Sequence, residues 1–166
     1  MSILDNIIFA FWFFLPAGLA NMFPIFAAHA PVLRRWDYPL DCNRTFRNRR
    51  IFGAHKTWRG LIVGILIGAL TALVQSQPMM LGVLLGLGAV LGDAAKSFFK
   101  RQRDIPSGES WPIFDQLDYI LGGIALSFWY WPLGAEQYLL VIAVYFVLHL
   151  LTSAIGYLLG LKQKII

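Results

Sequence analysis

Three aspartates and two lysines with helical spacing stand in one stretch of this chain, between long uncharged runs. Asp93, Lys96 and Lys100 follow one another at i, i+3 and i+7, so a helix that continues past the preceding uncharged run places all three on one face. Asp115 and Asp118, at i and i+3, share a face in the same way at a helix start. Because Mg²⁺ is commonly held by carboxylates together with substrate phosphates and water, these residues predict a two-metal arrangement for phosphoryl or nucleotidyl transfer.

Each half of this pattern has a simpler interpretation, which the sequence leaves open. The first half could be a plain salt-bridge ladder on a helix surface. The later pair of aspartates could serve only to stabilise a helix N-terminus through its dipole. On the functional interpretation, the candidates are Asp93, Asp115 and Asp118 as metal ligands, Lys100 beside them in catalysis, and Lys96, Ser97 and Arg101 in substrate binding.

A second polar segment ends with a basic run that leads directly into an apolar stretch. Lys56, Thr57 and Arg59 lie between Gly53 and Gly60. Lysine and arginine beside the free amides of a helix N-terminus form an anion site, so these three residues are candidate phosphate-binding residues. The competing interpretation is a positive-inside membrane anchor. No paired HxxxH or CxxC motif is present, so a zinc site is not expected.

The composition is that of an integral membrane protein. Of the 166 residues, 58% are hydrophobic and only 14% are charged, whereas about 25% is typical of soluble domains. A single all-α domain over residues 1–166 is expected, with five transmembrane helices and two polar cytoplasmic segments. The expected spans cover residues 7–30, 60–76, 79–97, 119–134 and 137–161. A signal peptide is the rival interpretation of the first span, but its apolar run is too long and lacks a preceding cation.

The basic residues predict how the chain crosses the membrane. With five spans, all fourteen Lys and Arg residues fall in segments on one side, which the positive-inside rule makes cytoplasmic. The chain is therefore expected in the cell (inner) membrane, with its N-terminus outside and its C-terminus and polar segments cytoplasmic. The formal charge of +5 does not require nucleic acid, because anionic lipid headgroups or an anionic substrate explain it equally well.

The second and third spans are short for two full crossings. They share 33 uncharged residues between Arg59 and Asp93, which give roughly 50 Å of helix, whereas two crossings need about 60 Å. The sequence therefore predicts a polar cavity sunk below the headgroup plane, with these two charged residues at its edge. Asn21 lies inside the first span, where it would either bond to another helix or line this cavity.

The motifs together resemble those of the CDP-archaeol synthase family, the archaeal-type branch of membrane cytidylyltransferases. The matching motifs are Ala20-Asn21-x-x-Pro24, Arg50-Ile51-Phe52-Gly53, Lys56-Thr57-Trp58-Arg59-Gly60, Gly92-Asp93, Ser97, Lys100-Arg101 and Asp115-Gln116-Leu117-Asp118. The resemblance implies transfer of CMP from CTP to a lipid phosphate, with Mg²⁺ as cofactor and pyrophosphate as the second product. It also implies the lipid substrate, 2,3-bis-O-geranylgeranyl-glycerol 1-phosphate.

Two other functions are kept as alternatives. A phosphatidate cytidylyltransferase that makes CDP-diacylglycerol would use the same metals and cations. A non-catalytic membrane anion transporter would carry similar cations, but transporters often show inverted repeats and broken helices, and neither is visible here. The expected partners are CTP, a lipid phosphate and membrane lipids, without nucleic acid, and the oligomeric state is not readable from the sequence.

Overall fold

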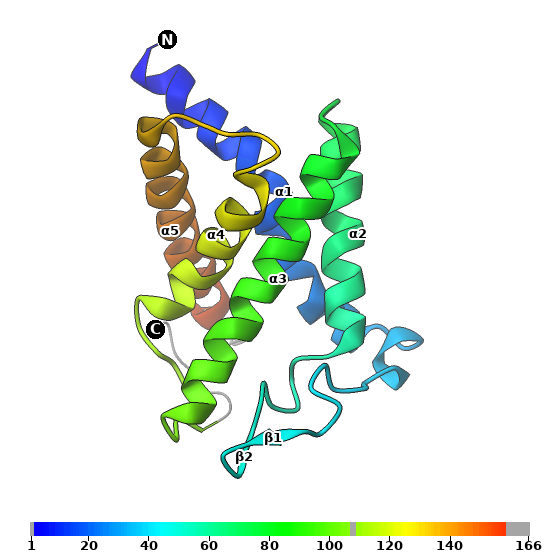
Figure 1. Cartoon of the computed structure of the whole chain (residues 1–166). Helices are drawn as coiled ribbons and strands as arrows, with labels where there is room; N and C mark the ends of the chain where they lie inside the picture. Colours follow the sequence, from blue (N-terminus) through cyan, green and yellow to red (C-terminus); the bar gives the residue numbers. More distant parts are fainter. Residues whose placement is uncertain (1, 107–108, 159–166) are drawn as a thin grey trace.

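The structure, a computed structural model, describes residues 2–106 and 109–158. Within these residues the chain is mainly helical (Figure 1). The elements are α1 (Ile3–His29), the short 3-10 helix η1 (Leu33–Arg35), β1 (Thr45–Phe46), β2 (Arg49–Arg50), α2 (Trp58–Val74), α3 (Met79–Gln102), α4 (Phe114–Ser127) and α5 (Ala135–Leu158).

Helix α3 packs along α2 and α4, while α1 crosses behind them and contacts every other long helix. The core where α1, α3, α4 and α5 meet contains Phe14, Leu85, Ile120 and Val141, all fully buried. Tyr145 fixes α5 against α1, because its hydroxyl donates to the carbonyl of Phe11 at 2.6 Å. Apolar packing holds these four helices together, and the hydrogen bond from Tyr145 satisfies a buried hydroxyl where α5 contacts α1.

The outer faces of the bundle remain apolar. Leu66 and Leu70 of α2 and Leu139, Val147 and Leu151 of α5 all have more than half of their surface exposed. Contiguous apolar surface of this kind is unfavourable in water and is typical of contact with lipid. Among the described residues, three helices, α1, α3 and α5, are long and apolar enough to cross a membrane, and α2 is a shorter apolar helix.

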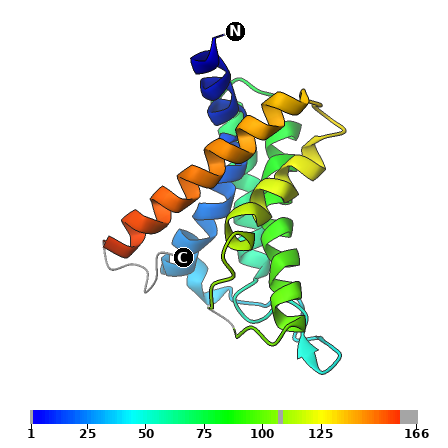
Figure 2. The same ribbon diagram turned by 90° about the vertical axis from the view of Figure 1, so that its left-hand side faces the viewer.

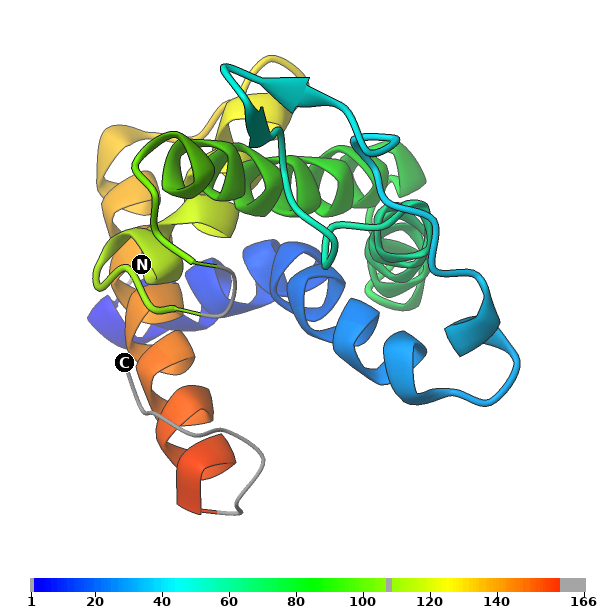
Figure 3. The ribbon, with the colours of Figure 1, turned by 90° about the horizontal axis from the view of Figure 1, so that it is seen from below.

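The polar segments gather at one end of the bundle. Helix α1 begins at the opposite end, where the α2–α3 turn and the α4–α5 connection also lie (Figures 1 and 2). The segment between α1 and α2 lies over α2 and α3 at the polar end, as the view from below shows (Figure 3). There β1 and β2 pair antiparallel, with Thr45 opposite Arg50 and Phe46 opposite Arg49. Both turn residues between the strands have positive φ, as a two-residue hairpin requires.

The helix boundaries differ from the expected spans most clearly at α4. This helix begins at Phe114 and ends at Ser127, five residues before the start and seven before the end expected for the fourth span. Its early start includes both aspartates of the site, and its early end precedes Pro132, which disfavours helix at the residue before it. Helix α3, in contrast, runs unbroken to Gln102, five residues beyond the expected end. The expected end of the fifth span at residue 161 lies outside the described residues.

Candidate functional site

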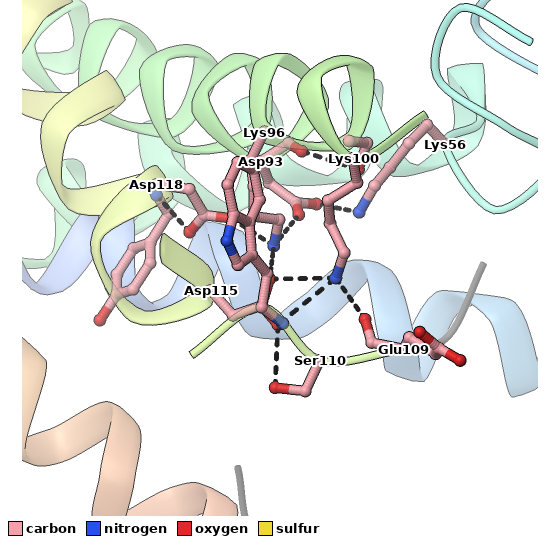
Figure 4. Close-up of polar contacts among 11 residues, drawn as sticks. Lys56, Asp93, Lys96, Lys100, Glu109, Ser110, Asp115 and Asp118 are labelled. Atoms are coloured by element: carbon pink, nitrogen blue, oxygen red, sulfur yellow. Dashed lines mark hydrogen bonds and ion pairs between the residues drawn. The ribbon is translucent and has the colours of Figure 1, made fainter. Parts of the chain in front are cut away.

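Lys96 lies at the centre of the three candidate carboxylates. Its Nζ atom lies 2.6 Å from an oxygen of Asp118, 3.0 Å from Asp115 and 3.2 Å from Asp93 (Figure 4). Asp93 and Lys96 come from one face of α3, whereas the other two carboxylates come from the first two turns of α4. The two halves of the sequence pattern are therefore brought together, and the ion pairs join two helices instead of forming only a ladder on one.

Two further lysines flank this cluster. The ammonium of Lys56, from the loop before α2, donates to the carboxylate of Asp93. The ammonium of Lys100, one helical turn beyond Lys96, donates to the backbone carbonyl of Glu109 and lies 3.3 Å from the carboxylate of Asp115. In the described part of the chain, no group of three or more His, Cys, Asp or Glu side chains is arranged to hold a metal ion as it stands.

Glycines allow α3 and α4 to approach closely enough for these contacts. A Cβ atom on Gly92 would lie 2.1 Å from the carbonyl oxygen of Asp118, and one on Gly88 would lie 2.3 Å from the carbonyl oxygen of Gly122. A side chain at either position would force the helices to move apart, because the nearest atoms belong to the backbone. Small residues at four-residue spacing are used in this way where membrane helices pack backbone to backbone. The spacing of the carboxylates across the interface depends on this seam.

Asp115 is also held by the segment that precedes α4. Its carboxylate accepts hydrogen bonds from the amide of Trp111 at 2.7 Å and from the hydroxyl of Ser110 at 3.3 Å. Ile113, directly before the helix, has a φ of 70°, which is rare for a β-branched residue and costs energy. The carboxylate of Asp115 is therefore oriented by local hydrogen bonds from the segment directly before the helix.

A cavity of about 530 Å³ lies beside the cluster, bounded by α1, the loop before α2, and the facing sides of α3 and α4. Asp93, Lys96, Asp115 and Asp118 line it, together with Lys56 from the loop. Its opposite wall is formed by α1, from Ala20 to Ala28, and its lining also includes Arg34, Asp37, His55 and His149. A cavity with Arg59 and Asp93 in its lining is thus present, whereas its depth below the headgroup plane stays a prediction.

The loop that carries Lys56 is anchored by Asp41. Its buried carboxylate accepts two hydrogen bonds from Arg50, at 3.1 and 2.6 Å, and one from each backbone amide of Phe52 and Gly53, both at 3.1 Å. Burial alone raises the pKa of Asp41, but the hydrogen bonds from Arg50 and from the amides outweigh it and keep the pKa below its ordinary value. This acceptor fixes the turn that leads into the cavity wall.

Thr57 and Arg59 are engaged with the chain itself. The hydroxyl of Thr57 accepts from the amide of Gly60 at 3.2 Å and so caps the N-terminus of α2. The buried guanidinium of Arg59 donates to backbone carbonyls of the segment around η1 and to Asp37 at 3.2 Å. Both residues line the cavity, but these contacts also give each a structural role.

The remaining predicted residues lie at different places. Asn21 lines the cavity from α1. Ser97 is buried, and its hydroxyl donates to the backbone carbonyl of Asp93, one turn earlier in α3, at 2.9 Å. The side chain of Arg101 lies near Gly53, where an added Cβ would be 3.9 Å from the Cδ of Arg101. The residues that line the cavity do not include Arg101, Ser97 or Lys100.

Sequence reasoning did not single out several residues that the structure places at the site. Arg34, Asp37 and His149 line the cavity, and Asp41 anchors its wall. Asp41 and Asp37 stand in a segment whose charges show no periodicity, and His149 is an ionisable residue in the apolar middle of α5. An ionisable residue within an expected membrane span is a functional candidate by default, so His149 could have been predicted from the sequence.

The chain is similar to known proteins in sequence and in fold. The family model described as CarS-like, CDP-archaeol synthase, matches residues 3–79 and 76–165. The CDP-archaeol synthase of Thermococcus onnurineus is 33% identical, covering 96% of this chain and 97% of its own length, and that of Halobacterium salinarum is 34% identical, covering 99% of each. The one of Methanopyrus kandleri is 38% identical, covering 92% of this chain and 89% of its own length.

A solved structure described as an intramembrane enzyme for archaeal membrane lipids biosynthesis superposes with a TM-score of 0.73. It is 32% identical in sequence, and the match covers 89% of this chain and 94% of that one. Its description and the apolar helices of this chain both indicate a membrane protein. The similarity extends over nearly the whole chain in sequence and in fold. The chain therefore belongs to the CDP-archaeol synthase family.

Proposed function

We propose that the cavity beside α3 and α4 is the site at which this chain transfers CMP from CTP to the phosphate of an archaeal lipid, with release of pyrophosphate. The observation that carries the proposal is the convergence of three carboxylates and three lysines beside a cavity whose far wall belongs to an apolar helix. The polar side suits a triphosphate, and the α1 side suits a lipid. The expected acceptor is 2,3-bis-O-geranylgeranyl-glycerol 1-phosphate, because the relatives are CDP-archaeol synthases.

The reaction needs charge neutralisation more than proton transfer. A phosphate monoester has a second pKa of about 6 and is largely dianionic near neutral pH, so its oxygen can attack the α-phosphorus of CTP without a general base. The new phosphorus–oxygen bond forms as the bond to pyrophosphate breaks. Two anions must meet, and cations that hold the phosphates lower that barrier. Lys56 and Lys96 face the cavity where this must occur.

Mg²⁺ is proposed as the cofactor, held by Asp93, Asp115 and Asp118. The donor chemistry fits, because three carboxylates already converge on one cation, the ammonium of Lys96, and hard divalent cations prefer oxygen ligands. When bound, the ion would supply positive charge to the triphosphate. The chain's own groups hold and orient the substrates around it.

The basic residues are proposed to share the phosphates. Lys96, Lys100 and Arg101 are assigned to CTP, with Ser97 as a supporting hydroxyl, and Lys56, Thr57 and Arg59 to the lipid phosphate or the outer phosphates of CTP. The structure supports Lys56 and Lys96 most strongly, because their ammonium groups already lie against the carboxylates at the cavity. Asn21 is assigned to the α1 wall of the same cavity.

All five helices are proposed to lie in the bilayer, with the polar end on the cytoplasmic side, the N-terminus outside and the C-terminus inside. The grouping of both polar segments at the end opposite the start of α1 supports this topology (Figure 2). Helix α4, with 14 residues, is roughly 21 Å long, less than the roughly 30 Å of a bilayer core. The aromatic-rich connection that follows it would complete the crossing.

The test is turnover by the purified protein. CTP labelled at the α-phosphate is supplied with Mg²⁺ and, separately, the isoprenoid glycerol 1-phosphate, phosphatidate and no lipid. Pyrophosphate release and a labelled CDP-lipid are expected with the isoprenoid lipid and not without lipid. A preference for phosphatidate would contradict the proposed acceptor. CTP or phosphate flux into vesicles without turnover would contradict the enzyme and support the transporter.

A further inference from the structure

Lys96 makes a set of contacts that neither neighbouring lysine makes. Its ammonium contacts all three carboxylates of the cluster, at 2.6 to 3.2 Å. The ammonium groups of Lys56 and Lys100 lie outside the cluster and form ion pairs with one carboxylate each, those of Asp93 and Asp115. Figure 4 shows the ammonium of Lys96 among the three carboxylates, with Lys56 and Lys100 to one side of them. Lys96 therefore occupies a position from which one cation contacts all three carboxylates.

A divalent cation bound by the same three carboxylates must take that position, because an ammonium and a metal ion cannot both fill it. The charges lead to the same conclusion. Three aspartates and three lysines are balanced without any ligand, and the side chain of Lys96 is only 14% exposed. A lone Mg²⁺ would add two positive charges to a partly buried site, where uncompensated charge is costly. A triphosphate that enters with the metal removes this excess and offers the ammonium new anionic partners.

Resting on the magnesium site proposed above, we propose that Lys96 is a built-in counter-ion. It fills the divalent-cation position in the ligand-free enzyme and moves from the carboxylates to the phosphates of CTP when the metal ion enters. Lys96 thereby keeps the ligand-free site folded and neutral, and it couples binding of the metal to binding of the nucleotide. Binding of metal alone is weak because the ion must displace a tethered ammonium that has no other anion to contact.

The experiment measures Mn²⁺ binding, not activity. Electron paramagnetic resonance reports free Mn²⁺ during titration of the purified full-length protein without CTP. Lys96→Met, Lys56→Met and Lys100→Met each remove one positive charge that contacts a carboxylate of the cluster, but only the first removes the charge that contacts all three. Lys96→Met is expected to bind Mn²⁺ at least tenfold more tightly than the unmodified protein. The two matched variants are expected to change the affinity less than threefold.

A second variant, which is expected to change the affinity for Mn²⁺ in the opposite direction, keeps the test decisive if Lys96→Met does not fold. Lys96→Arg retains the charge and can hold carboxylates through two parallel hydrogen bonds, so it is expected to weaken Mn²⁺ binding at least threefold. Equal or tighter binding by Lys96→Arg, or equal tightening by all three methionine variants, would overturn the role of Lys96 and leave the magnesium site standing. Absence of Mn²⁺ binding in every variant, or binding by Lys96→Met that survives addition of Asp118→Asn, would overturn the metal site and the role of Lys96 together.

Discussion

The close contact between α3 and α4 at Gly92 gives a prediction whose size follows from the structure. In Gly92→Ala the new Cβ would lie 2.1 Å from the carbonyl oxygen of Asp118, whereas real Cβ atoms essentially never approach below 3.0 Å. The obstacle is backbone, so no side chain can rotate away, and the two helices must separate by at least about 0.9 Å. Asp93 and Asp118 flank this contact, and the separation moves them apart.

Overpacking of this kind costs about 1–3 kcal/mol of stability, and a displacement of about 1 Å can lower the rate about a hundredfold. We therefore expect Gly92→Ala to fold in the membrane but to lose about two orders of magnitude in kcat. The assay is transfer of label from CTP to lipid phosphate, with size-exclusion chromatography as the test of folding.

Gly134→Ala is the matched control, because the atom nearest to its new Cβ is a flexible glutamine oxygen 3.7 Å away. It should retain the activity of the unmodified protein. If Gly92→Ala is as active as Gly134→Ala, the argument that helix spacing sets the carboxylate geometry is wrong.

Three other changes test separate parts of the site. Asp118→Asn should lower turnover by more than about a hundredfold, because loss of a residue that only supports a metal ligand already lowers activity by about 10- to 100-fold. Asp104→Asn, at an exposed ion pair, should leave turnover unchanged. Equal activities of the two variants would remove Asp118 from the site. Lys100→Ala should raise the KM for CTP about tenfold or more, as loss of a hydrogen bond to a charged group does, and an unchanged KM would exclude it from CTP binding. The pKa of Asp41 is lowered in the folded protein, so the stability that this carboxylate contributes is complete above about pH 4 and is lost as the pH falls through the folded-state pKa. Asp41→Asn should therefore be less stable than the unmodified protein in thermal unfolding at neutral pH, and it should lack this loss of stability in acid. An identical pH profile of stability in the two proteins would refute the anchoring role of Asp41.

The sequence predicted the helical bundle and the two halves of the site because both depend on local features of the chain, namely the length of the apolar runs and the spacing of charged residues. The uncharged runs predicted helices, and the i, i+3, i+7 spacing placed Asp93, Lys96 and Lys100 on one face, as α3 shows. The shared face of Asp115 and Asp118 at a helix start was also predicted correctly. The resemblance to the CDP-archaeol synthase family was confirmed by the comparisons.

The relations between distant segments were not predictable in this way. Nothing local indicates that Lys96 lies among all three carboxylates, because that contact depends on the α3–α4 spacing. The anchor at Asp41 is also tertiary, since its partners lie 9 to 12 residues further along an irregular loop. The end of α4 was placed seven residues too late, because an apolar composition continues through the aromatic turn after Ser127.

Diffraction from crystals soaked with Mn²⁺ and CTP tests the central claim most directly. The account predicts an anomalous peak at metal–ligand distance, about 2.1 Å for a magnesium-like ion, from carboxylate oxygens of Asp93, Asp115 and Asp118, with phosphate oxygens completing the shell. A nucleotide-bound structure in which these carboxylates still hold only Lys96, and the anomalous peak lies elsewhere, would contradict it.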